Sequence, residues 1–257
     1  MKIFSNRTIV ISGASRGMGR AFAIQLAEEG ASLVLLGRNE TELNRTQQMI
    51  SETGAHSVVY TLDLTNNSSI AECGKKIRKN HENIYGLINC AGVSGQNYMN
   101  EPDNGVWDSV ITTNLTGTYH LTKELLPNIS DGGKIVNVSS VLGKFGVPGY
   151  AAYCTSKHGV IGFTRTLALE LASRKISANA ICPGWVNTEM SQQGIQFAAN
   201  EMNITPQEFW KIASQNIPLK DIIEPEEIAH LVSFILHPKT KNLTGQAITY
   251  DGGQVMY

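Results

Sequence analysis

Two residues in the second half of the chain have the types and spacing of an acid–base pair. Tyr153 and Lys157 stand four residues apart, so on a helix both side chains project from the same face. A free phenol has a pKa of about 10, which makes it a poor acid–base catalyst at neutral pH. A lysine ammonium one turn away favours the phenolate, so we expect Lys157 to lower the pKa of Tyr153.

Ser140 completes this candidate catalytic group. It lies thirteen residues before Tyr153 and follows an apolar segment of strand length, 134–138. At the end of a strand its hydroxyl can hydrogen-bond a substrate oxygen and stabilise the charge that develops there.

The same Tyr-x-x-x-Lys spacing occurs a second time, at Tyr119 and Lys123. One chance copy is unremarkable in a chain with 8 tyrosines. Only the Tyr153 copy has a serine at a strand end upstream. Tyr119 falls in the middle of a predicted helix, 106–125, where packing or an interface explains it better. We therefore assign the chemistry to Tyr153.

A glycine-rich turn near the N-terminus indicates a bound dinucleotide. The segment from Ser12 to Gly19 reads Ser-Gly-Ala-Ser-Arg-Gly-Met-Gly. Glycines allow a tight turn and close approach of the backbone to a pyrophosphate, and a following helix offers its free N–H groups to the anion. Glycines alone are weak evidence in a chain with 24 of them. The position of this turn, after one strand and directly before a helix, makes the motif specific.

The end of the second predicted strand, 32–36, indicates which dinucleotide is bound. An NAD site usually places an acidic side chain there, to bind the ribose hydroxyls. Here Gly37 and Arg38 follow the strand, and Glu40 comes only in the next helix. Gly37 leaves space for a 2′-phosphate, Arg38 offers a guanidinium that matches phosphate oxygens, and Arg16 can approach from the other side. We predict NADP(H).

Two further strand ends supply candidate cofactor contacts. Asp63 follows the predicted strand 57–61 and can accept a hydrogen bond from the adenine amino group, although capping of the next helix explains it nearly as well. The segment Asn89-Cys90-Ala91-Gly92 ends the predicted strand 86–90, and its small residues allow close packing against the ribose. The expected contacts are Gly13, Ser15, Arg16, Gly17, Met18, Gly19, Arg38, Asp63, Leu64, Asn89, Ala91 and Gly92.

The elements that must position these residues alternate between strands and helices. Strands are predicted at 8–12, 32–36, 57–61, 86–90, 134–138, 177–181 and 247–250, and helices at 17–29, 40–52, 68–79, 106–125, 153–172 and 225–236. This alternation is typical of a doubly wound parallel sheet with helices on both faces and ligand-binding loops at the carboxyl ends of the strands. With no linker or repeat, we predict a single-domain, seven-stranded α/β Rossmann fold over residues 1–257.

One segment departs from the alternation. The region from about residue 188 to 218 is predicted to be an irregular loop that covers the substrate. Its large apolar residues, together with Trp185 just before it, suit an apolar or extended substrate, although helix packing explains some of them equally well. These residues are Met190, Ile195, Phe197, Met202, Phe209 and Trp210.

Composition excludes several other classes of protein. The net charge is −1 and the basic residues are scattered, which gives little support to nucleic-acid or anionic-membrane binding. No segment has the roughly 18 apolar residues that span a bilayer, and residues 1–6 are too short and polar for a signal peptide. The four cysteines, Cys73, Cys90, Cys154 and Cys182, have neither redox-pair nor metal-ligand spacing. We expect no metal, reduced thiols and a cytoplasmic location.

Taken in order, these motifs resemble those of the short-chain dehydrogenases/reductases, over essentially the whole chain. Two departures, Ser12 in place of threonine and Cys90 in place of the second asparagine of Asn-Asn-Ala-Gly, are conservative in size. The matching motifs are Gly13-x-x-x-Gly17-x-Gly19, Asp63, Asn89-Cys90-Ala91-Gly92, Asn114, Ser140, Tyr153-x-x-x-Lys157 and Pro183-Gly184 leading to Thr188.

The resemblance implies a mechanism in which the cofactor delivers hydride to a carbonyl carbon while Tyr153 protonates the oxygen. Tyr153 and Lys157 then also contact the cofactor, where Lys157 holds the nicotinamide ribose. Asn114 holds a water that relays protons from the lysine to solvent. Taken alone, Asn114 is better explained as a polar residue inside a helix. The resemblance adds cofactor contacts from the segment after the sixth strand, with Val186 and Thr188 at the carboxamide. These contacts are Pro183, Gly184, Val186 and Thr188.

Within this family, the chain looks most like reductases of 3-oxoacyl thioesters, including fatty-acid and polyketide ketoreductases. The resemblance implies an NADPH-dependent carbonyl reductase whose substrate is a ketone or acyl thioester, free or bound to a carrier protein. It also implies a homotetramer that pairs the helices 106–125 and 153–172.

Three alternatives remain. The first is a dehydrogenase of a steroid, cyclic or sugar alcohol. The second is a nucleotide-binding regulator without catalysis, against which the intact set of Ser140, Tyr153, Lys157 and Asn114 argues. The third is a sugar-nucleotide epimerase, for whose substrate domain this chain has no room.

Overall fold

The central strands of the sheet are runs of apolar residues that are buried on both faces. In the computed structural model, which describes residues 2–256, β1 (Thr8–Ser12), β4 (Ile84–Asn89) and β6 (Ser177–Pro183) are buried almost throughout, as is the second half of β5 (Ile129–Val138). Such runs are typical of parallel strands covered by helices on both sides. Met1 and Tyr257, which the predicted domain includes, lie outside the described residues.

Seven parallel strands form one sheet in the order β3-β2-β1-β4-β5-β6-β7. The outer strands are β2 (Ser32–Gly37), β3 (Ser57–Thr61) and β7 (Ala247–Tyr250), and the edge strands β3 and β7 are only half-buried. The predicted single-domain, doubly wound α/β fold is therefore confirmed.

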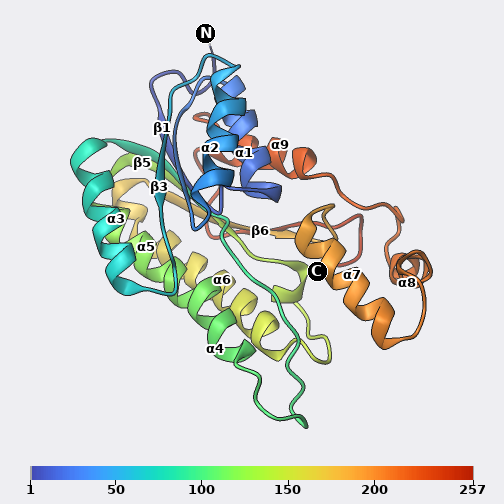
Figure 1. Cartoon of the computed structure of the whole chain (residues 1–257). Helices are drawn as coiled ribbons and strands as arrows, with labels where there is room; N and C mark the ends of the chain where they lie inside the picture. The colour runs from blue at the N-terminus through green and yellow to red at the C-terminus, as the bar shows by residue number, and fades with distance from the viewer. Residues whose placement is uncertain (1, 257) are drawn as a thin grey trace.

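Alternate residues of each strand face different helix layers. Ile9 and Ile11 of β1 pack with α1 (Gly17–Glu28), α2 (Glu40–Ser51) and α9 (Pro225–Leu236). Val10, between them, packs with α3 (Asn67–Asn80), α5 (Gly117–Leu125) and α6 (Ala151–Glu170). Figure 1 shows these two layers on opposite sides of the sheet. Burial of each such side chain contributes roughly 1.5–3 kcal/mol.

The site is positioned where the winding of the chain reverses. Strands β2 and β3 are added in turn on one side of β1, and the chain then crosses over to place β4 on the other side of β1. Ser12 at the end of β1 is opposite Asn89 at the end of β4. Loops that leave two such strands diverge and open a crevice at their carboxyl ends. The Ser12 hydroxyl accepts hydrogen bonds from the N–H groups of Cys90 at 3.2 Å and Ala91 at 3.3 Å, which ties the two strand ends together.

The predicted helix 106–125 is interrupted by a π-helical turn. It consists of α4 (Val106–Ile111), the turn η1 (Thr112–Thr116) and α5. Single π turns inside helices are rare and often lie at functional sites. Asn114 is in the middle of this turn.

The prediction of an irregular loop from 188 to 218 is wrong, because most of this segment is helical. Thr188 caps α7 (Glu189–Glu201) by accepting the N–H of Ser191 at 3.4 Å. Thr205 and Glu208 form a reciprocal capping box at the start of α8 (Pro206–Ala213). The two helices lie together beside the layered body in Figure 1. Trp185 packs edge-on against Phe209 and Trp210 of α8, with ring centroids 6.3 and 6.1 Å apart.

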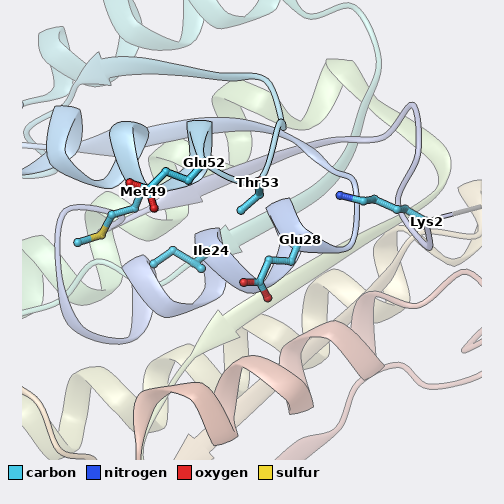
Figure 2. Close-up of a pocket in the computed structure, with 6 residues that line it drawn as sticks. All are labelled: Lys2, Ile24, Glu28, Met49, Glu52 and Thr53. Atoms are coloured by element: carbon cyan, nitrogen blue, oxygen red, sulfur yellow. The ribbon is translucent and has the colours of Figure 1, made fainter.

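A second hollow lies between the ends of α1 and α2, at the amino edge of the sheet. Figure 2 shows its lining, which mixes one cation, two carboxylates and three uncharged residues. The lining consists of Lys2, Ile24, Glu28, Met49, Glu52 and Thr53. None of the predicted site residues lies there. Within residues 2–256, no helix combines the length and the apolar character needed to cross a bilayer.

Candidate active site

A cleft at the carboxyl edge of the sheet contains most of the predicted cofactor contacts. It lies between the ends of β1 to β4 on one side and the start of α7 on the other. The predicted contacts that line it are Gly13, Ser15, Arg16, Gly17, Met18, Gly19, Arg38, Asp63, Leu64, Ala91, Gly92 and Thr188. Residues with no predicted contact also line it, namely Gly37, Asn39, Glu42, Leu62, Thr65, Cys90, Val93, Thr113, Glu189 and Met190.

The glycine turn has the geometry of a phosphate cradle. Gly13 has a φ of +74°, and a Cβ at this position would lie 2.7 Å from the Cα of Ala91, so a larger residue does not fit. A Cβ on Gly19 would lie 2.2 Å from the carbonyl oxygen of Gly13. Helix α1 starts at Gly17, and the N-cap residue Arg16 makes no side-chain cap. The first N–H groups of α1 and its positive dipole end therefore suit a dinucleotide pyrophosphate.

The predicted catalytic residues meet at the inner end of this cleft. Lys157 is only 5% exposed, and its Nζ donates to the carbonyl oxygen of Val138 at 2.9 Å. The same Nζ lies 5.5 Å from the centre of the Tyr153 ring, and Ser140 is hydrogen-bonded to Tyr153. A Cβ on the cleft residue Gly92 would be 3.5 Å from the Nζ of Lys157, so the group lies directly behind the cleft wall.

Burial controls the protonation of both groups. It raises the pKa of Tyr153 to about 12, and the hydrogen bond with Ser140 opposes this rise. It lowers the pKa of Lys157 to about 8, against the opposing influence of Cys90 and Cys182. The expectation that Lys157 lowers the pKa of Tyr153 is thus wrong for this structure, because desolvation raises the pKa of the phenol and Lys157 is not among the groups that oppose this rise. Tyr153 is a neutral phenol at physiological pH, which is the form that donates a proton.

The second Tyr-x-x-x-Lys copy lies outside the cleft lining. Lys123 Nζ donates to the Tyr119 hydroxyl at 3.4 Å and lies 5.7 Å from the centre of the Tyr119 ring, close to the 5.5 Å of the first pair. Tyr119 is 41% exposed, and its ring packs edge-on against Phe163 of α6. This arrangement agrees with the packing or interface role predicted for Tyr119.

Asn114 joins two parts of the site. Its side chain accepts the N–H of Val93 at 2.8 Å and donates to the Val93 carbonyl oxygen at 2.9 Å and to the Ser156 hydroxyl at 3.2 Å. It therefore holds the loop after β4 against α6. The main-chain carbonyl oxygen of Asn114 accepts a hydrogen bond from the Thr118 hydroxyl at 2.9 Å. The water relay that the resemblance implies stays a prediction.

Asp63 lines the cleft and does not cap the next helix. Its carboxylate accepts the N–H and hydroxyl of Thr65 at 2.9 and 2.8 Å, and these bonds lower its pKa. The side chain of Asn66 caps α3 instead, by accepting the N–H groups of Ser68 and Ser69. The capping explanation for Asp63 is wrong, and its carboxylate remains a candidate contact.

Six predicted cofactor contacts lie outside the lining of the cleft, and two of them, Tyr153 and Lys157, are the catalytic residues described above. Asn89 is buried, and its amide donates to Thr122 at 2.9 Å and Asn137 at 2.8 Å, so the side chain ties β4 to β5 and α5. The side chain thus has a structural role, and a contact between Asn89 and the cofactor stays a prediction. The other three, which lie at the end of β6 and just after it, are Pro183, Gly184 and Val186.

The cleft also contains carboxylates that were not predicted. Glu42 is held by Arg20, whose guanidinium lies 2.6 Å from it and also binds Thr46 and the Ser15 carbonyl oxygen. Glu189, the first residue of α7, forms an ion pair with Arg16. Neither acidic residue stands at a strand end in the sequence, so no local signal marks them as part of this site.

The fold and the site together define an α/β protein that binds a dinucleotide next to a half-buried tyrosine and a buried lysine and serine. Residues 13–254 match the family described as enoyl-(acyl carrier protein) reductase. The chain belongs to this family, one of the short-chain dehydrogenases/reductases.

Similar proteins cover nearly the whole chain. A 3-oxoacyl-[acyl-carrier-protein] reductase of Staphylococcus epidermidis is 32% identical over 98% of this chain and 100% of its own length. A reductase of the same name from Thermotoga maritima is 32% identical over 97% of this chain and 98% of its own length. Among solved structures, an actinorhodin polyketide ketoreductase with NADPH has a TM-score of 0.91 at 32% identity, covering 98% of both chains. Levodione reductase has a TM-score of 0.91 at 29% identity, also covering 98% of both.

Proposed function

We propose that this protein is an NADPH-dependent carbonyl reductase that reduces a 3-oxoacyl thioester or a polyketide ketone to the alcohol. The observation that carries the proposal is the group of Tyr153 with the buried residues Ser140 and Lys157, which lies directly behind a dinucleotide cleft.

The reaction follows from the positions of these residues. Bound NADPH supplies a hydride, with its electron pair, to the carbonyl carbon. Ser140 orients the carbonyl oxygen, and the Tyr153 hydroxyl gives this oxygen its proton. Lys157 borders the cleft behind Gly92, where its ammonium can hold the ribose and stabilise the phenolate that remains. Solvent then returns a proton to Tyr153. Run backwards, the same steps oxidise an alcohol.

Carbonyl reduction is favoured over reduction of a carbon–carbon double bond, in spite of the family description. Ser140 and Tyr153 are joined by a hydrogen bond, so two hydroxyl groups converge where one substrate oxygen can accept from both. The relatives described as 3-oxoacyl reductases and as a polyketide ketoreductase support the same substrate class. Their names also support a carrier-bound thioester as the substrate.

An initial-rate panel with both cofactors tests the proposal. It compares an acetoacetyl thioester, a bicyclic ketone, a steroid ketone and a sugar alcohol. We expect the highest kcat/KM for the acetoacetyl thioester with NADPH. A preference for the steroid or the sugar alcohol would support the dehydrogenase alternative. No turnover of any of the four would support the regulator.

Cofactor preference is expected to depend on Arg38. Within residues 2–256, Arg38 lines the cleft without an ion pair or hydrogen bond to another residue. A charge-assisted bond to a phosphate contributes roughly 1.5–3 kcal/mol. Arg38→Ala should therefore weaken NADPH binding about tenfold or more, and leave the Kd for NADH nearly unchanged.

Fluorescence titration with each cofactor measures this effect. Arg45→Ala is the matched control, because Arg45 is an exposed arginine of α2 that does not line the cleft. Equal weakening of NADPH and NADH binding, or a wild-type kcat/KM that is higher with NADH, would contradict the assignment.

We further propose a homotetramer that works in the cytoplasm. Large apolar side chains are exposed on the three helices that would meet a second copy: Trp107 of α4 is 43% exposed, Tyr119 of α5 41% and Leu169 of α6 81%. Covering such a face favours association. All four cysteines are unpaired, in keeping with a reducing compartment. Light scattering at micromolar concentration should give four times the 28.0 kDa chain mass, and a monomeric mass would disprove the assembly.

A further inference from the structure

An ion pair joins the glycine turn to the first residue of α7 at the rim of the cleft. Arg16 follows Ser15 in the turn, and its guanidinium binds the carboxylate of Glu189. The two segments also touch next to this pair, since a Cβ on Gly17 would lie 3.3 Å from the methyl carbon of Thr188. Both charged residues line the cleft.

Arg16 also lies near the part of the cleft where the adenosine ribose is expected. Its charge, together with Arg20 and Arg45, acts on Glu42, which lines the cleft beside Arg38 and Asn39. A Cβ on Gly37 would be 3.6 Å from the hydroxyl of Ser15, so the turn that carries Arg16 packs against the end of β2. Arg16 and Arg38 thus approach this part of the cleft from two different strands.

The other carboxylates of the cleft form their ion pairs and hydrogen bonds with residues other than Arg16. Glu42 binds Arg20 at 2.6 Å, and Asp63 accepts two hydrogen bonds from Thr65. Glu189 is the carboxylate that occupies Arg16. In this arrangement Arg38, the other arginine that lines the cleft, forms no ion pair among residues 2–256, and its charge acts on Asp63.

We propose that Glu189 limits the preference for NADP(H) by competing with the 2′-phosphate for Arg16. This inference rests on the proposed function, because it assumes that the 2′-phosphate binds at this end of the cleft. A phosphate monoester carries a charge of about −1.5 to −2 at neutral pH and binds best to more than one cation. To gain Arg16, the phosphate must displace Glu189 or share the guanidinium with it.

The expected effect is moderate, because the pair is solvent-exposed. The side chains of Arg16 and Glu189 are 63% and 55% exposed, and exposed pairs contribute roughly 0.2–1 kcal/mol. That corresponds to a change in affinity of at most about fivefold. Salt screens such charges, so the effect should shrink as ionic strength rises.

The test compares Glu189→Gln with the wild-type protein, using ligands that differ only by the 2′-phosphate. Adenosine 2′,5′-bisphosphate and AMP are titrated by calorimetry, and NADPH and NADH by fluorescence. We expect Glu189→Gln to bind the bisphosphate and NADPH about two- to fivefold more tightly, with AMP and NADH unchanged. In an Arg16→Gln background the same substitution should have no effect on any ligand.

Glu201→Gln is the matched control, since Glu201 is an exposed glutamate at the other end of α7. It removes the same charge from the same helix and should change no affinity. Equal changes for ligands with and without the 2′-phosphate would overturn the inference, as would weaker NADPH binding or tighter binding that persists without Arg16. If the wild type itself does not prefer the bisphosphate over AMP, the NADP(H) assignment fails. If it does, and Glu189→Gln has no effect, only this inference fails.

Discussion

Replacing Tyr153 by phenylalanine should lower kcat for carbonyl reduction by about 10³-fold while cofactor affinity changes by less than about twofold. Removal of a general acid typically costs 10²- to 10⁴-fold in rate, and this value is of that order. The Tyr153 phenol, with its pKa raised to about 12, is the neutral donor at working pH. Phenylalanine keeps the ring and removes only the hydroxyl. The residues that line the cofactor cleft are unchanged.

Single-turnover reduction and NADPH titration measure the two effects separately. Tyr119→Phe makes the same chemical change in the second Tyr-x-x-x-Lys copy. Because Tyr119 is 41% exposed and packs against Phe163 outside the cleft, its loss should leave kcat within about twofold of the wild type. An inactive Tyr119→Phe beside an active Tyr153→Phe would show that the wrong copy was chosen.

Replacing Lys157 by methionine should have opposite effects on activity and stability. Loss of the ammonium removes the group that holds the ribose and stabilises the Tyr153 phenolate, so kcat should fall by about 10²-fold or more and NADPH should bind more weakly. Stability should rise, because burial lowers the pKa of Lys157 from 10.5 to about 8. Keeping this buried lysine charged at pH 7 costs roughly 3 kcal/mol.

The net gain in stability should be about 1–2 kcal/mol at pH 7, because methionine also leaves the Val138 carbonyl oxygen without the lysine's hydrogen bond. The folded protein holds the Lys157 proton less readily than the unfolded chain does. The contribution of Lys157 to the free energy of unfolding of the wild type therefore rises with pH between about 8 and 10.5. The advantage of Lys157→Met should be complete below about pH 8 and disappear above about pH 10.5.

Urea unfolding at several pH values measures this dependence. Lys134→Met is the matched control, because Lys134 is 4% exposed, lies outside the site and donates to the Thr240 carbonyl oxygen, and burial lowers its pKa as well. It should also relieve the cost of a buried charge, but without loss of turnover. If Lys157→Met is less stable than the wild type at pH 7 and the difference does not vary with pH, the explanation from burial is wrong.

The regular elements could be predicted closely because their signals are local. The bounds of β1, β3, β7 and α9 agree with the residues predicted for them. The capping signals of α7 and α8 are local too. Thr188 and the Thr205–Glu208 capping box are visible in the sequence, so both helices could have been predicted from it. The π turn at Thr112–Thr116 carries no such signal, because the hydrophobic period on either side is that of an α-helix.

The sequence by itself determined the order of strands and helices, the glycine turn and the residues of the catalytic group, because each depends on spacing along the chain. Only the tertiary structure decided their environments. It showed that burial raises the pKa of Tyr153, and that the Asn89 side chain joins β4 to β5. It also paired Arg16 with Glu189, 173 residues away. Desolvation and charge pairing depend on distances through space, and the crossover that sets β4 beside β1 creates those distances only when the whole sheet has formed.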